Sequence, residues 1–154
     1  MSERVRLRAS ITDSIQQKAE RVRQAADGVT ARIEKFEEWL NRLPGRTETV
    51  TYVRHPEARD QDDMTAFGIR LARANKRWAL SYASWEIDDP DEPINWQPLT
   101  EASLKLKLHA LRMFPTLLES IEKSQQELVN EIEAATKEFD AFAETLGVHG
   151  EGKQ

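Results

Sequence analysis

The chain of 154 residues contains no cysteine, which excludes disulfide bonds, thiolate nucleophiles and cysteine-ligated metals. No stretch approaches the roughly 18 uninterrupted apolar residues that a membrane-spanning helix needs. The segment from Met1 to Arg8 has no apolar core, so we do not expect a secretory signal. These absences predict a cytoplasmic protein that makes no contact with a membrane.

Motifs for chemistry are also lacking. The histidines do not have the spacing of metal ligands, since they are His55, His109 and His149. Gly68 stands alone rather than inside a glycine-rich phosphate loop. We therefore expect no cofactor, no metal and no catalytic residue, and the leading hypothesis is non-enzymatic. A small enzyme or ligand-binding module, with a pocket between the sheet and a helix over 100–114, is the third hypothesis.

A broad basic face is missing as well. The formal net charge is −5, and residues 116–147 carry eight acidic groups against two lysines. Residues 10–43 are neutral, with six groups of each sign, and residues 1–9 carry a net +2. Because duplex DNA binding requires many cations on one face, this distribution argues against a generic DNA-binding protein.

Two long heptad patterns of apolar residues are what the sequence does contain, one near each end. They predict long helices over 10–43 and 116–147, with a separate short helix over 100–114 because Pro115 should interrupt the second pattern. Ser10 is the expected cap of the first helix. Residues 1–9 form a basic arm in this interpretation, and residues 148–154 form a loose tail.

One antiparallel register matches every apolar layer of the two patterns. Its layers include Ile15 with Leu146, Ala19 with Phe142, Val22 with Phe139, Ala26 with Ala135, and Leu43 with Leu118. The large Phe142 meets the small Ala19, as a filled core requires. In the same register Arg32 lies near Glu131 across the seam. The patterns therefore predict an antiparallel coiled-coil helical hairpin.

The region between the helices has strand periodicity. The alternation over residues 47–87 predicts a three-stranded antiparallel meander with a tight turn at Ala74-Asn75-Lys76. Residues 88–99 are expected to form an acidic, proline-rich loop. The predicted fold class is α+β, mostly α, as a single domain with the sheet and short helix at the tip of the hairpin. This order of elements resembles the general layout of prefoldin subunits, without a shared motif.

Function is then a hypothesis about surfaces. The leading hypothesis is an adaptor, accessory or chaperone-like module that binds another protein and self-associates, with a dimer favoured. The residues expected at the helix seam and oligomer contacts are Phe36, Leu117, Gln125, Leu128, Val129 and Ile132. The second hypothesis is a nucleic-acid-associated regulator whose partner or anion contacts are Arg70, Arg73, Lys76 and Arg77.

Overall fold

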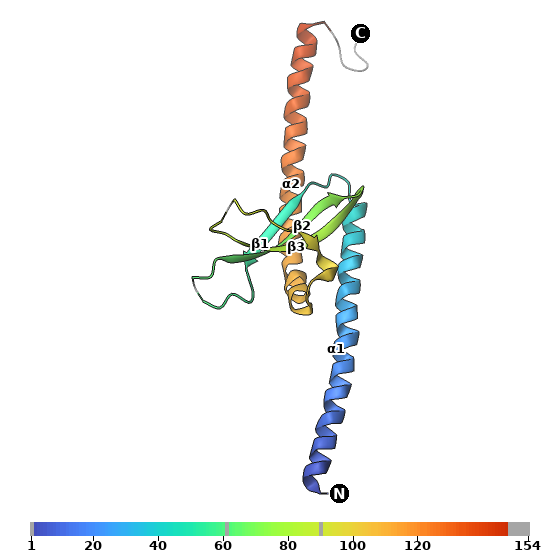
Figure 1. Ribbon diagram of the computed structural model, residues 1–154. Helices are drawn as coiled ribbons and strands as arrows, with labels where there is room; N and C mark the ends of the chain where they lie inside the picture. The colour runs from blue at the N-terminus through green and yellow to red at the C-terminus, as the bar shows by residue number, and fades with distance from the viewer. Residues whose placement is uncertain (1, 61, 90, 148–154) are drawn as a thin grey trace.

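The computed structural model describes residues 2–60, 62–89 and 91–147 and has an α+β fold with two long helices and a four-stranded antiparallel sheet. The predicted tail, residues 148–154, lies outside the described residues. Figure 1 shows the sheet beside the middle of the molecule, with one helix protruding from it in each direction.

Helix α1 spans Glu3–Arg42. The Oγ atom of Ser2 accepts a hydrogen bond from the amide of Val5 and caps the helix, so residues 3–9 are helical and the predicted separate basic arm is wrong. The helix ends before Pro44, and Gly45 turns the chain with a φ of 71°.

The sheet contains β1 (Thr49–Arg54), β2 (Thr65–Ala74), β3 (Arg77–Glu86) and β4 (Gln97–Pro98), in the order β1-β2-β3-β4. Asn75 and Lys76 both have positive φ and form the two-residue turn that was predicted between β2 and β3. The prediction of three strands is wrong by one. The short β4 lies in the predicted proline-rich loop and pairs with the outer edge of β3.

Helix α2 spans Leu104–Thr145 and follows the short 3₁₀ helix η1 (Leu99–Glu101). The prediction of two helices separated at Pro115 is wrong, because α2 runs through this residue. A proline in a helix removes one backbone donor. Burial of Met113 and Leu117 on either side of Pro115 favours a continuous helix, since both residues pack in the core.

The two helices run in the same direction rather than as an antiparallel hairpin (Figure 1). Three contacts follow one another in the same order along both helices and on into the turn after α1. They join Thr30 to Lys107 (2.9 Å), Phe36 to Phe114 (ring centroids 4.3 Å) and Pro44 to Gln125 (3.3 Å). The predicted antiparallel pairing within the chain, and with it the prefoldin-like layout, is therefore wrong.

Docking of η1 determines where along α1 the second helix begins. Leu99 of η1 is fully buried and joins the same core as Ile33 and Leu40 of α1. Helix α2 therefore begins beside the middle of α1, and from there it continues past the end of α1. Phe67, Ile69 and Leu71, which alternate along β2, complete this core from the sheet.

We refer to the sheet, η1 and the helical segments 29–42 and 104–121 as the head. The helical part before the head, residues 3–26, is the N-terminal arm. The part after it, residues 126–146, is the C-terminal arm.

Candidate protein-interaction site

The six residues predicted for the helix seam and oligomer contacts fall into two groups. Leu117 is fully buried in the head, Phe36 packs on Phe114, and the Nε2 atom of Gln125 donates to the carbonyl of Pro44. These three side chains make contacts within their own chain. The second group lies further along α2, where the side chains are more exposed. Leu128 is half-buried, and Val129 and Ile132 are exposed.

Both arms continue the heptad pattern but expose it. On the N-terminal arm Ile15 is 61% exposed and Val22 is 55% exposed. On the C-terminal arm Phe139, Phe142 and Leu146 are 62%, 58% and 63% exposed. Exposed apolar surfaces of this extent are typical of interaction sites. Figure 1 shows the arms on opposite sides of the head, so they do not cover each other.

The arms carry opposite charge. The N-terminal arm has six basic residues against three acidic ones, a net charge of +3. The C-terminal arm has six acidic residues against one lysine, a net charge of −5. Charge of opposite sign on two helical surfaces favours contact between them and disfavours contact between two copies of the same arm.

The four predicted anion-contacting residues are spread over different surfaces. Arg70 lies with its guanidinium carbon 4.6 Å from the ring centroid of Trp96, while Lys76 lies in the exposed turn. Strand alternation puts Arg73 on the opposite face of β2 from Arg70. Arg77 lines a groove of about 340 Å³ together with Glu34, Glu37, Glu38 and Thr100.

An aromatic row lies on the face of the sheet that points away from the helices, and the sequence reasoning missed it. The ring of Trp85 is 5.7 Å from Tyr52 and 5.7 Å from Trp96, measured between centroids. Gly68 lies beneath it, since a Cβ atom at this position would overlap the outer ring atoms of Trp85. An isolated glycine within a strand is the available sequence signal for such a close approach.

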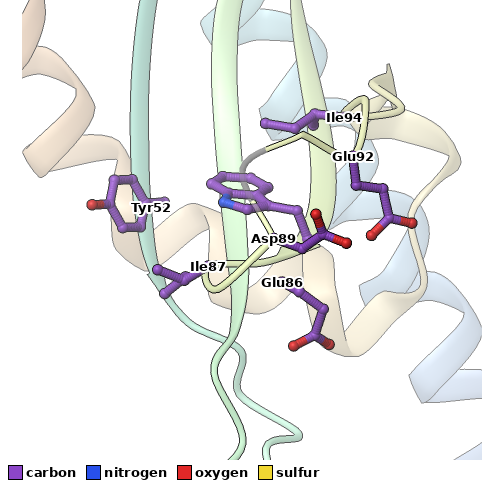
Figure 2. A pocket seen from close by; sticks show the side chains of 7 residues that line it. Tyr52, Glu86, Ile87, Asp89, Glu92 and Ile94 are labelled. Carbon is purple, nitrogen blue, oxygen red and sulfur yellow. The ribbon is translucent and has the colours of Figure 1, made fainter.

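One end of this row borders a small pocket of about 230 Å³. Tyr52, Trp85, Ile87 and Ile94 supply its apolar lining. Its acidic lining residues are Glu86, Asp89 and Glu92. Figure 2 shows the carboxylates of Asp89 and Glu92 on the side away from Tyr52, and the carboxylate of Glu86 pointing in a different direction from these two. Chemically, aromatic rings next to carboxylates favour a cationic group over an anion.

Helix α1 closes the part of the outer edge of β3 that precedes the pairing with β4. The side chain of Asn41 accepts from the amide of Trp78 (2.9 Å) and donates to its carbonyl (2.6 Å). Glu37 accepts from the amide of Leu80 at 3.0 Å. These side chains satisfy backbone groups that a further strand would otherwise pair, and they hold α1 against the sheet.

The described residues include no group of histidine and acidic side chains that could hold a metal ion, and no helix among them is long and apolar enough to cross a membrane. Comparison with known proteins gives no assignment: no protein-family model, no curated protein and no solved structure matches this chain.

Proposed function

We propose that this protein is a non-enzymatic assembly module that self-associates through its two helical arms. The observation that carries this proposal is the exposure of the apolar heptad positions on both arms, which include Ile15, Val22, Phe139 and Phe142. The head already has a closed core, whereas each arm presents an apolar stripe suited to another helix.

Helix energetics support the same conclusion. A helix nucleates at a cost, and a single helix in water gains little stability beyond its backbone hydrogen bonds. Each arm continues from a helix that the head anchors, which removes the nucleation cost. Burial of the exposed Phe139 and Phe142 side chains against a partner would add about 25 cal/mol for each Å² of apolar surface removed from water.

The alternative nucleic-acid function has less support from the geometry. Arg70 stacks on Trp96, and Arg77 lies beside three glutamates of α1. A binding surface for phosphates needs several cations that face one ligand.

Sedimentation velocity over a range of protein concentrations tests the proposal. We expect wild-type protein to sediment with more than the chain mass of 17.7 kDa. The double variant Phe139→Ser/Phe142→Ser should weaken self-association by roughly tenfold or more, because it removes two aromatic contacts.

A matched control is Ile87→Ser/Ile94→Ser, which removes two exposed apolar side chains from the head instead of the arm. This control should self-associate like the wild type. Far-ultraviolet circular dichroism and a cooperative urea transition would verify that both variants stay folded. A wild-type protein that stays monomeric at every concentration would contradict the proposal.

A further inference from the structure

The charge of the arms selects a partner. Pairing of two N-terminal arms would bring together charges of +3 and +3, and pairing of two C-terminal arms would bring together −5 and −5. Only a contact between unlike arms combines opposite charge. Since the two arms of one chain point away from each other, the complementary arm must come from a second copy (Figure 1).

The basic residues of the N-terminal arm are Arg4, Arg6, Arg8, Lys18, Arg21 and Arg23, and the acidic residues of the C-terminal arm are Glu127, Glu131, Glu133, Glu138, Asp140 and Glu144. Each set is distributed along its arm rather than concentrated at one point. Lys18, Arg21 and Arg23 lie between Ile15 and Ala26, and Glu138, Asp140 and Glu144 lie between Ala135 and Leu146. These two stretches keep opposite net charge, so the attraction acts within the contact described below.

Layer matching selects an antiparallel register between the copies. Large side chains of the C-terminal arm meet smaller or branched ones of the N-terminal arm when Ile15 faces Leu146, Ala19 faces Phe142 and Val22 faces Phe139. In the same register two small residues, Ala26 and Ala135, face each other. A slip by one heptad towards the N-terminus of α1 places Arg8 against Leu146 and Thr12 against Phe142. A slip the other way needs Val29 against Phe139, and the head already covers Val29. The first register therefore buries more apolar surface and no arginine.

The same register ends where the exposed stripes end. Val29, the next seam residue after Ala26 on α1, is only 9% exposed because it belongs to the head. On α2 the exposure of the seam falls from Ile132 to Leu128, which is half-buried, and Gln125 contacts the head at Pro44. Apart from Ala26, which is half-buried beside the head, the contact between copies therefore uses side chains that each chain leaves exposed.

The parallel direction of α1 and α2 allows two copies to pair all four arms with each other, so that no further copy is added. Because α1 and α2 run the same way in one copy, a second copy turned upside down presents its C-terminal arm antiparallel to the N-terminal arm of the first. The same rotation brings the remaining two arms together. Such an arrangement has a two-fold axis and leaves no arm unpaired.

We propose that two copies of this chain form a reciprocal two-fold dimer, in which the N-terminal arm of each copy pairs antiparallel with the C-terminal arm of the other, with Val22 against Phe139 and Ala26 against Ala135. This inference rests on the proposed self-association. It names the partner, the register and the closed symmetry.

Engineered cysteines test the arrangement directly, because the natural chain has none. In the double variant Ala26→Cys/Ala135→Cys, the two positions face each other between copies and are close enough for a disulfide. We expect mild oxidation to convert the protein almost completely into a covalent dimer of twice 17.7 kDa on a non-reducing gel, with no larger species. A ladder of larger species would overturn the proposal, because it would reveal open head-to-tail chains.

Three further variants complete the test. The single variants Ala26→Cys and Ala135→Cys should each stay uncross-linked, since cross-linking of either one would indicate pairing between like arms. The double variant Ala19→Cys/Ala135→Cys samples the one-heptad slip and should cross-link far less than Ala26→Cys/Ala135→Cys. Preferential cross-linking of this slipped pair would overturn the register.

Sedimentation of the reduced variants separates the two proposals. Consider an Ala26→Cys/Ala135→Cys protein that sediments as a dimer when reduced and yet fails to form a disulfide on oxidation. That result would overturn the reciprocal arrangement and leave self-association intact. A monomeric wild-type protein would overturn both. Far-ultraviolet circular dichroism verifies that each cysteine variant keeps its helices.

Discussion

The head and the arms carry the same heptad pattern with opposite outcomes. In the head, Ile33 and Leu40 of α1 are fully buried by the sheet, η1 and α2. On the N-terminal arm, Ile15 occupies an equivalent seam but is 61% exposed. A heptad pattern thus identifies the apolar face of a helix without identifying which chain covers that face.

The largest expected difference between the regions concerns a single isoleucine. Ile33→Ala removes a fully buried side chain and leaves a cavity in the head, so it should lower the free energy of unfolding by about 2–5 kcal/mol. Urea denaturation followed by circular dichroism measures this change. The same substitution on the arm, Ile15→Ala, should leave the unfolding of the head unchanged at low protein concentration and weaken self-association instead. Equal losses in both variants would remove the distinction between head and arm.

A second difference concerns two glycines with opposite expected signs. Gly68→Ala would force a methyl group into the ring of Trp85 and towards the carbonyl of Thr51 at 3.3 Å. We expect a destabilisation of about 1–3 kcal/mol and a shift in tryptophan fluorescence as the ring moves. Gly28→Ala, where α1 enters the head, meets only the end of the flexible Arg32 side chain. It should stabilise the helix by up to about 1 kcal/mol. Denaturant midpoints of both variants provide the measurement.

The comparison also explains how much of the fold the sequence could predict. Heptad patterns correctly placed helical segments near both ends, and period-two alternation with Asn75 and Lys76 predicted the β2–β3 hairpin. The relative direction of the helices could not be predicted in this way, because an apolar stripe pairs in either direction. Burial of Leu99 beside α1 determines where α2 begins, and a lone leucine after a proline has no periodicity that reveals such docking.

The aromatic row escaped prediction for a related reason. Trp96 lies in an irregular segment, and its partner Arg70 is on β2, so only the folded sheet brings the two side chains together. Trp85 and Gly68 lie on neighbouring strands, and the pairing of Gly68 with Ala83 and of Ala66 with Trp85 sets the ring over the glycine. Strand register was needed before either contact could be inferred.

A third, smaller difference concerns asparagines. Asn41→Ala would leave the amide and carbonyl of Trp78 without their partner from α1, at a cost of about 1–2 kcal/mol in the unfolding of the head. Asn130 on the C-terminal arm bonds only to the neighbouring turn, through Gln126, at an exposed position. Asn130→Ala should therefore change the unfolding free energy by no more than about 0.5 kcal/mol. Thermal or urea unfolding of the two variants measures this difference between the part of α1 that is bonded to the sheet and the exposed part of α2. An equal, small effect of both substitutions would show that Asn41 does not hold α1 to the sheet.

The smallest expected difference concerns acidic residues and pH. Asp63, in the loop before β2, accepts hydrogen bonds from the hydroxyl of Thr65 (2.5 Å) and from its amide (3.0 Å), and these bonds lower the pKa of its carboxyl below the usual 3.8. The folded state therefore favours the carboxylate. The resulting stabilisation is complete above the unfolded pKa and is lost as the pH falls below about 3.8 through the lowered folded pKa.

Asp63→Asn should remove this part of the pH dependence, so its urea midpoint should fall less than that of the wild type between about pH 5 and pH 2.5. Thr65→Val, which deletes the hydroxyl that contributes most to the shift, should act in the same direction. Asp140→Asn on the C-terminal arm is the matched comparison, since that carboxylate is exposed and lies outside the head. Asp140→Asn should leave the pH dependence of head unfolding unchanged. It should reduce the salt sensitivity of self-association, because it removes one of the charges by which the two arms attract each other. Identical pH profiles for Asp63→Asn and the wild type would show that the loop carboxylate contributes no more to the head than an arm carboxylate does.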